Sequence, residues 1–195
     1  VYLPETQEWV RSIYHKAKAL DPHRIVEDNS PCRYDHVETD LNTWHFYLNG
    51  YEIVRDHIRK VVKETYPGAS FNFIGENRQT DAPLMNSECG MVWGVDGSAG
   101  DSDLAWQYHY MLNEYRLHEK LCGFVFTEFH DVVNEFNGYY RIDNTDKDFG
   151  YQDFCRGMSL CDLHAADFLA VDCPPVQTVA PGAAVDVPLV LSSFS

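Results

Sequence analysis

The stretch Leu84-Met85-Asn86-Ser87-Glu88-Cys89-Gly90 begins with apolar residues, reaches a carboxylate and closes on a glycine. We interpret residues 84–87 as a short buried strand, after which Gly90 allows the backbone to turn at once. In a parallel β/α fold the carboxyl ends of the strands form the active face. Glu88 is therefore placed for chemistry, although a glutamate on an exposed loop, or in an ion pair at the rim of a sheet, has the same sequence pattern.

Helices and strands alternate on both sides of this stretch. Helical periodicity covers residues 4–20, 50–64 and the segment that contains Leu104, Tyr108, Met111 and Tyr115. Strands are predicted at residues 24–27, 84–87 and 123–127, with a further candidate at 37–40. Such alternation is typical of right-handed βα units around a parallel sheet. A closed barrel of eight such units needs roughly 250 residues, so this α/β pattern, which ends near residue 164, predicts about half of a (β/α)₈ TIM barrel.

The pattern changes near His164, where helical periodicity ends. Residues 167–171 and 183–191 are predicted to be strands, joined by Pro-Pro and Pro-Gly turns. Because two strands are not stable alone, we interpret them as the start of an all-β, immunoglobulin-like sandwich. The expected organisation is a partial TIM-barrel domain over residues 1–164 and a truncated β-sandwich over residues 165–195. The chain begins with Val1 instead of methionine, so we expect it to be a fragment of a larger protein.

The net charge of the chain limits which classes of partner it can bind. The chain has 195 residues, of which 30 are acidic and 15 basic, and its net charge is −15. Such a protein repels nucleic-acid backbones and anionic membrane surfaces, so neither partner is expected. No signal peptide is visible, and the compartment stays undetermined because the N-terminus looks truncated. The six cysteines contain no Cys-x-x-Cys pair, and no cofactor-binding motif occurs, so no cofactor is expected.

Histidines that lie near carboxylates in the sequence raise the question of a metal site. His36 precedes Glu38 by two residues, and His130 is followed directly by Asp131. Neither pair has the spacing of a His-Glu-x-x-His motif or of a His/Cys zinc site, so no metal is expected. The charged turn over residues 143–148 is predicted to be solvent-exposed.

Polar and aromatic side chains gather where other predicted strands end. The segment 40–47 contains four consecutive ring-bearing side chains, which can line a cleft for a flat, polar ligand or simply pack against a helix. Asp28-Asn29-Ser30 follows the first predicted strand, and Phe126-Thr127-Glu128 ends the last one. If the sheet is parallel, these segments lie at the same edge as Glu88.

The order of these segments resembles that of glycoside hydrolase family 2, which includes β-galactosidases, β-glucuronidases and β-mannosidases. The matching segments are Asp21-Pro22-His23-Arg24, Asp28-Asn29-Ser30, Thr39-Asp40-Leu41-Asn42 with His45-Phe46-Tyr47, Ser87-Glu88-Cys89-Gly90, and Thr127-Glu128 with Asp131, Glu135 and Asn137-Gly138. The tail resembles the sandwich that follows the barrel in that family. The resemblance implies barrel strands five to eight and retaining hydrolysis of a β-glycoside, with a β-galactoside favoured.

The resemblance also implies roles for individual residues. Glu88 matches the family's nucleophile, a carboxylate that attacks the anomeric carbon and forms a glycosyl-enzyme. Tyr47 is the best match to the tyrosine that orients this nucleophile and keeps it ionised, and His45 is a lesser one. The residues expected to contact the carbohydrate substrate are Asn29, His45, Phe126, Glu128 and Trp93. For Trp93, simple packing is an equal alternative.

One essential group has no match. A retaining enzyme needs a second carboxyl group about 5–5.5 Å from the first. The family carries it in an Asn-Glu pair at the end of strand four, and nothing before Pro4 matches that pair. We therefore expect the acid/base upstream of Val1 and expect the chain alone to be inactive.

Two readings from other functional classes stay open. One is a non-catalytic carbohydrate-binding relative that keeps the cleft and lacks the acid/base. The other is a structural α/β module in which the matching segments serve packing only. A homo-oligomer of the full-length protein is compatible with every reading.

Overall fold

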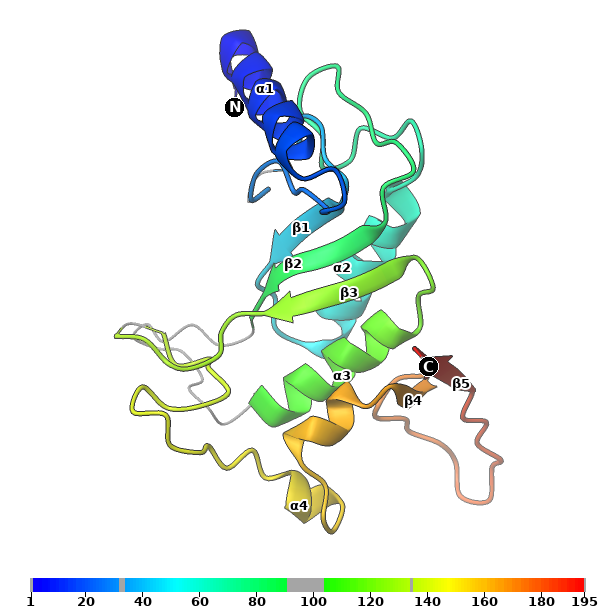
Figure 1. Ribbon diagram of the computed structural model, residues 1–195. Helices are drawn as coiled ribbons and strands as arrows, with labels where there is room; N and C mark the ends of the chain where they lie inside the picture. The colour runs from blue at the N-terminus through cyan, green and yellow to red at the C-terminus, as the bar shows by residue number, and fades with distance from the viewer. Residues whose placement is uncertain (1, 32–33, 91–103, 134, 195) are drawn as a thin grey trace. The chain divides into compact units, whose positions relative to one another are not determined.

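The computed structural model describes residues 2–31, 34–90, 104–133 and 135–194 (Figure 1). It divides into two compact units, each assembled from several stretches of the chain. Unit 1 consists of Val1–Phe46, Arg59–Cys89 and Lys120–Phe126. Unit 2 consists of Tyr47–Ile58, Gly90–Glu119 and Thr127–Ser195. The domain boundary after residue 164 stays a prediction.

Unit 1 contains a three-stranded parallel sheet in the order β1-β2-β3. The strands are β1 (Asn42–Phe46), β2 (Leu84–Cys89) and β3 (Leu121–Phe126), and their arrows point the same way in Figure 1. In sequence, helix α2 (Tyr51–Glu64) lies between the first two strands and α3 (Leu104–Arg116) between the last two. The prediction of a parallel sheet whose strands alternate with helices in sequence is therefore confirmed for these five elements, whereas the half-barrel stays a prediction.

The two strands predicted before residue 41 are wrong. Residues 24–27 and 37–40 contain no strand. Their backbone is held by loop hydrogen bonds: the Val26 amide donates to the Asp40 carboxylate at 2.9 Å, and the Asp40 amide donates to the Val26 carbonyl at 3.0 Å. A carboxylate thus satisfies a backbone donor that a neighbouring strand would otherwise satisfy.

Strand β1 lies inside the segment that was predicted to be an aromatic loop. Asn42, Thr43 and Trp44 are consecutive and fully buried. A strand buried on both faces has no alternation of apolar and polar residues, which removes the pattern that identifies a strand in a sequence. The buried Asn42 amide donates to Gln79 at 2.8 Å, so its polar group is satisfied inside the core.

Helix α1 spans Pro4–Leu20, as predicted, and Pro4 stands in its first turn, where a missing amide proton costs nothing. Polar contacts hold this helix against the rest of unit 1. Arg11 donates to the Glu38 carboxylate at 2.8 Å, and Lys18 lies 2.9 Å from the Asp40 carboxylate. Hydrophobic burial contributes less, since Val10 is the buried residue of this helix.

Unit 2 is built on α3. Its core face contains Tyr108, Met111 and Tyr115, all buried, which confirms these three residues of the predicted helical face, and Leu112 is buried with them. The side chain of Leu104, the fourth residue of the predicted face, lies outside the described part of the structure. The remaining elements are α4 (Tyr151–Phe154), a 3-10 helix (Leu160–His164), β4 (Asp167–Val171) and β5 (Leu189–Ser193).

None of the helices in the described parts of the chain has the length and apolar character that crossing a bilayer requires.

Strands β4 and β5 form an antiparallel pair in which Leu169 is opposite Leu191. β4 lies where it was predicted. β5 begins at Leu189, later than the predicted start at residue 183, because residues 183–188 form an exposed segment without regular structure. The immunoglobulin-like sandwich stays a prediction.

Candidate functional site

The carboxyl ends of the three parallel strands place sequence-distant side chains at one edge of the sheet. His45 on β1 is opposite Glu88 on β2, and Cys89 on β2 is opposite Phe126 on β3. The register shifts between Trp44 and His45, so this bulge brings His45 into line with the glutamate. Three of the predicted site residues therefore share this edge.

Glu88 has a histidine as its neighbour. His45 Nδ1 lies 3.5 Å from Glu88 Oε2, and His45 Nε2 lies 3.3 Å from the Ser30 hydroxyl. The imidazole is 7% exposed and the Glu88 side chain 35% exposed. The arrangement therefore leaves the carboxylate accessible to a ligand while a buried imidazole limits its orientation.

A buried aspartate–histidine pair lies next to β1. His36 Nδ1 is 2.6 Å from Asp28 Oδ1, and both side chains are fully buried. The Thr43 amide donates to His36 Nε2 at 3.0 Å, so Nε2 is the accepting nitrogen and Nδ1 carries the proton donated to Asp28. The pair thereby holds the backbone of β1 two residues before His45.

Asp28 is ionised although it is buried. Burial acts to raise the pKa of its carboxyl, but His36 and the amides of Val37 and Glu38, which donate at 2.7 and 3.1 Å, more than offset it and lower the pKa below its ordinary value. His36 therefore belongs to a structural pair with Asp28 and not to a metal site with Glu38. Among the residues that the structure describes, no three His, Cys, Asp or Glu side chains are grouped to bind a metal ion.

Acid is expected to destabilise the protein through Asp28. Because its folded pKa lies below that of the unfolded chain (about 3.9), ionised Asp28 stabilises the folded state above that pH, and this contribution is lost as the pH falls through the folded pKa. Urea unfolding at pH 7 and pH 3 measures the loss, which should be smaller in Asp28→Asn. The exposed Asp186→Asn is the control and should keep the wild-type loss. An equal loss in both variants would contradict the assignment.

Two further predicted site residues of unit 1, Asn29 and Phe126, make contacts within the protein. The Asn29 amide donates to the Asp35 carbonyl at 3.2 Å. Phe126 is 7% exposed, so its ring is mostly packed inside the protein. Trp93 lies outside the described residues.

Tyr47 belongs to unit 2, where it crowds the backbone at Gly90. A Cβ atom at Gly90 would lie 2.9 Å from Tyr47 Cε1 and 2.9 Å from the Asn137 amide nitrogen. Such distances are shorter than ordinary van der Waals contact, so a side chain at this position would require Tyr47 and Asn137 to shift. The tyrosine ring therefore packs closely against the backbone of Gly90.

Glu128 lies in unit 2, in the loop that follows β3. Its Oε1 atom is buried and has no hydrogen-bond partner among the described residues. Burial, followed by the charges of Glu135 and Asp131, raises the pKa of its carboxyl. Glu128 therefore accepts a proton more readily than an ordinary glutamate does.

A buried ion pair fixes this loop. Lys147 Nζ lies 2.6 Å from Asp131 Oδ1, and the two side chains are 1% and 6% exposed. Asp131 also accepts from the Gly138 amide at 3.0 Å, and Lys147 donates to the Phe136 carbonyl at 2.7 Å. The prediction that residues 143–148 are simply solvent-exposed is therefore wrong for Lys147, because a partner distant in sequence compensates its charge.

Sequence reasoning missed Ser30 as a neighbour of His45, and it missed both buried pairs. Asp28-Asn29-Ser30 was singled out as polar residues after a strand, but nothing in the sequence indicates which side chain each contacts. For the Asp131–Lys147 pair, the only available signal was an isolated lysine in an acidic turn.

Neither sequence comparison identifies the chain: no family model matches it, and no curated protein does. Solved structures do match. Two structures of a GH2 β-galacturonidase from Eisenbergiella tayi, one bound to galacturonate and one to glycerol, match with TM-scores of 0.57 and 0.55 and 15% identity, over 81% of this chain and 31% of that one. A β-glucuronidase from Faecalibacterium prausnitzii matches with a TM-score of 0.50 and 16% identity, over 76% of this chain and 28% of that one. The chain thus spans about a third of the length of these structures, and it shares its fold with that part of the GH2 glycoside hydrolases.

Proposed function

We propose that this chain carries the nucleophile of a retaining β-glycoside hydrolase and that Glu88 is that nucleophile. The observation that supports this most directly is the position of Glu88. It is an accessible carboxylate beside a buried histidine, at the carboxyl edge of a parallel sheet. The shared fold with GH2 glycoside hydrolases is in accord with this placement.

In the proposed reaction, Glu88 attacks the anomeric carbon of a β-glycoside. The bond to the leaving group breaks as the bond to the carboxylate oxygen forms, and a proton passes to the departing oxygen. Water then hydrolyses the glycosyl-enzyme and restores the carboxylate. We place the acid/base that supplies and later removes the proton outside this chain, about 5–5.5 Å from Glu88 in the complete site.

The other predicted site residues have distinct proposed roles. His45, with Ser30 behind it, limits the rotation of the carboxylate and can donate a hydrogen bond to it. Tyr47 supplies a phenol hydroxyl for the same purpose. Asn29, Phe126 and Glu128 are proposed to contact the sugar.

The proposed substrate is a β-galactoside. The structural relatives are a galacturonidase and a glucuronidase, so the corresponding uronides are the competing substrates to test. They differ from neutral sugars by a carboxylate, and a site must compensate that charge to accept it.

Covalent trapping tests the function directly. The full-length protein that contains this chain is incubated with 2,4-dinitrophenyl 2-deoxy-2-fluoro-β-galactoside, whose leaving group needs no protonation, and is digested for mass spectrometry. A 2-fluorogalactosyl adduct is expected on the peptide that contains Glu88, and none in Glu88→Gln. An adduct on another carboxylate would refute the nucleophile assignment. Sugar binding without an adduct would indicate the carbohydrate-binding relative, and neither adduct nor binding the structural module.

A further inference from the structure

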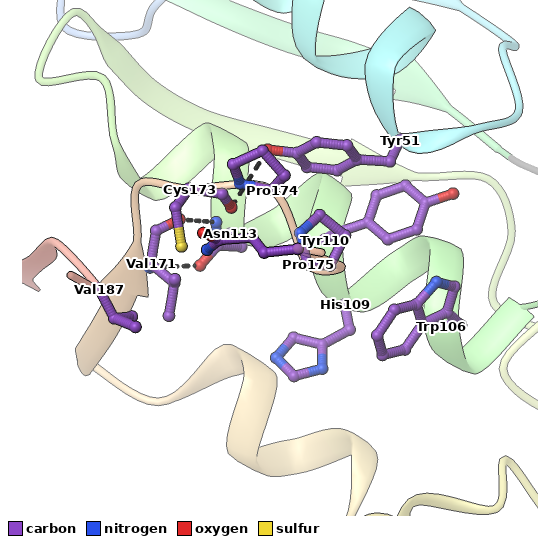
Figure 2. A pocket seen from close by; sticks show the side chains of 11 residues that line it. Tyr51, Trp106, His109, Tyr110, Asn113, Val171, Cys173, Pro174, Pro175 and Val187 are labelled. Carbon is purple, nitrogen blue, oxygen red and sulfur yellow. Dashed lines mark hydrogen bonds between the residues drawn. The ribbon is translucent and has the colours of Figure 1, made fainter. Parts of the chain in front are cut away.

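Unit 2 contains a cavity of about 320 Å³ that the proposed reaction does not use (Figure 2). Its walls come from one face of α3, from the first residue of α2 and from the segment around β4 and β5. The residues that line it are Tyr51, Trp106, His109, Tyr110, Asn113, Val171, Cys173, Pro174, Pro175, Gln177 and Val187. A volume of this size falls within the range of small-molecule sites.

Helix α3 presents a second aromatic face to this cavity. Trp106, His109, Tyr110 and Asn113 follow helical spacing and lie on one side of the helix, whereas the core residues of α3 lie on the other. Tyr110 contacts Trp106 edge to face, with ring centres 6.1 Å apart at 86°, and contacts Tyr51 in the same way at 5.5 Å and 89°. These contacts fix the ring planes, while Trp106 stays 43% exposed.

The opposite wall is also held in place. The Asn113 amide donates to the Val171 carbonyl at 2.8 Å and accepts from the Val171 amide at 2.7 Å. The Tyr51 hydroxyl donates to the Cys173 carbonyl at 3.3 Å, as the dashed line in Figure 2 shows. The cavity is therefore formed before any ligand arrives, which lowers the entropic cost of binding.

The lining specifies the kind of ligand. None of the lining residues is an aspartate, glutamate, lysine or arginine. Burial lowers the pKa of His109, so its imidazole is neutral at pH 7, with one nitrogen that donates and one that accepts. The His109 ring and the exposed Gln177 side chain line the same cavity. Such a lining suits an uncharged ligand with an apolar face for the indole and hydroxyl groups for His109 and Gln177.

We propose that this cavity binds one uncharged pyranose ring, stacked on Trp106 and hydrogen-bonded by His109 and Gln177. A pyranose combines an apolar face of C–H groups with a rim of hydroxyls, which is the combination that this lining accommodates. The cavity shares no residue with the Glu88 edge, so the proposal does not depend on Glu88 being a nucleophile.

Calorimetry of the full-length protein tests this site with methyl β-D-galactopyranoside as the probe. Trp106→Ala should weaken one class of binding sites by about tenfold or more, which corresponds to the loss of one good stacking contact. The matched control is Trp9→Ala, another exposed tryptophan outside the cavity, which should leave binding unchanged. Gln177→Ala, at an exposed position that tolerates truncation, should weaken the same class about threefold, because it removes a rim hydrogen bond.

Two further measurements distinguish this cavity from the proposed active site and from a site for charged or aryl ligands. Trp106→Ala should hydrolyse an aryl β-galactoside at the wild-type rate, which distinguishes this cavity from the proposed active site. Galacturonate should bind the cavity at least tenfold more weakly than the neutral galactoside, since nothing in the lining compensates its charge. Unchanged galactoside binding in both Trp106→Ala and Gln177→Ala would overturn the proposal. So would tighter binding of p-nitrophenol than of the sugar, because this would identify an apolar aryl site.

Discussion

Replacing Glu88 by glutamine in the full-length protein is expected to lower kcat for an aryl β-galactoside by roughly 10⁴–10⁶-fold, the loss seen when a covalent nucleophile is removed. Glutamine has the shape of glutamate and can still hydrogen-bond to His45, so the fold and substrate binding should change little. An amide oxygen, however, does not form a glycosyl-enzyme. KM should therefore stay within a few-fold of wild type while turnover disappears.

Glu76→Gln is the matched control for this experiment. Glu76 is a fully exposed glutamate in the same unit, so its variant should keep wild-type kcat and KM. Initial rates with p-nitrophenyl β-galactoside measure both constants. If Glu88→Gln kept the turnover of Glu76→Gln, Glu88 would not be the nucleophile.

Glu88→Ala gives a second, independent result. Azide can occupy the space left by the carboxylate and attack the anomeric carbon directly, forming a C–N bond as the leaving group departs. The product should be an α-galactosyl azide, because one displacement inverts the configuration where two retain it. A β-azide, or no rescue by azide in a folded variant, would argue against attack from the Glu88 side.

Replacing Lys147 by methionine is expected to lower the free energy of unfolding by about 3–5 kcal/mol, because it leaves the Asp131 carboxylate buried without an opposite charge. The side chains of Lys147 and Asp131 are 1% and 6% exposed, so bulk water does not reach the carboxylate to solvate it. Urea unfolding followed by circular dichroism measures the change. Lys16→Met, at an exposed position, should change stability by less than about 0.5 kcal/mol.

A double replacement checks the cause. Lys147→Met combined with Asp131→Asn removes both charges, so the double variant should be more stable than Lys147→Met alone. If the double variant lost as much stability as the two single losses added together, packing around Lys147 would explain the effect instead of its charge. Because the same loop carries Glu128, Lys147→Met should also raise the KM for the galactoside.

The sequence predicted those elements that have a one-sided pattern. Helices α1 and α2 have regular helical spacing, and β2 is a short apolar run closed by Gly90, so each was placed to within a few residues. Strand β1 was missed because it is buried on both faces and contains polar residues that are satisfied inside the core, such as Asn42. Its hydrogen bonds depend on partners such as Gln79 that local sequence does not reveal.

The candidate site also contains residues that could be predicted from local sequence and residues that could not. Glu88 was identifiable because a carboxylate at a strand end, followed by glycine, is a local pattern. Its pairing with His45 depends on the register of two strands separated by α2 and on a bulge after Trp44. Ser30 and Lys147 were not identifiable, since each acquires its role from a residue at least fifteen positions away.

Cys173 offers a chemical handle in the wall of the cavity on α3. Its thiol is half-buried, whereas Cys122, Cys155 and Cys161 are exposed. After the exposed thiols are replaced by serine, disulfide-linked fragments could be screened under mildly reducing conditions, where only fragments with real affinity for the cavity stay attached. The same cysteine could then carry a spectroscopic label, so that occupancy is read without any catalytic turnover.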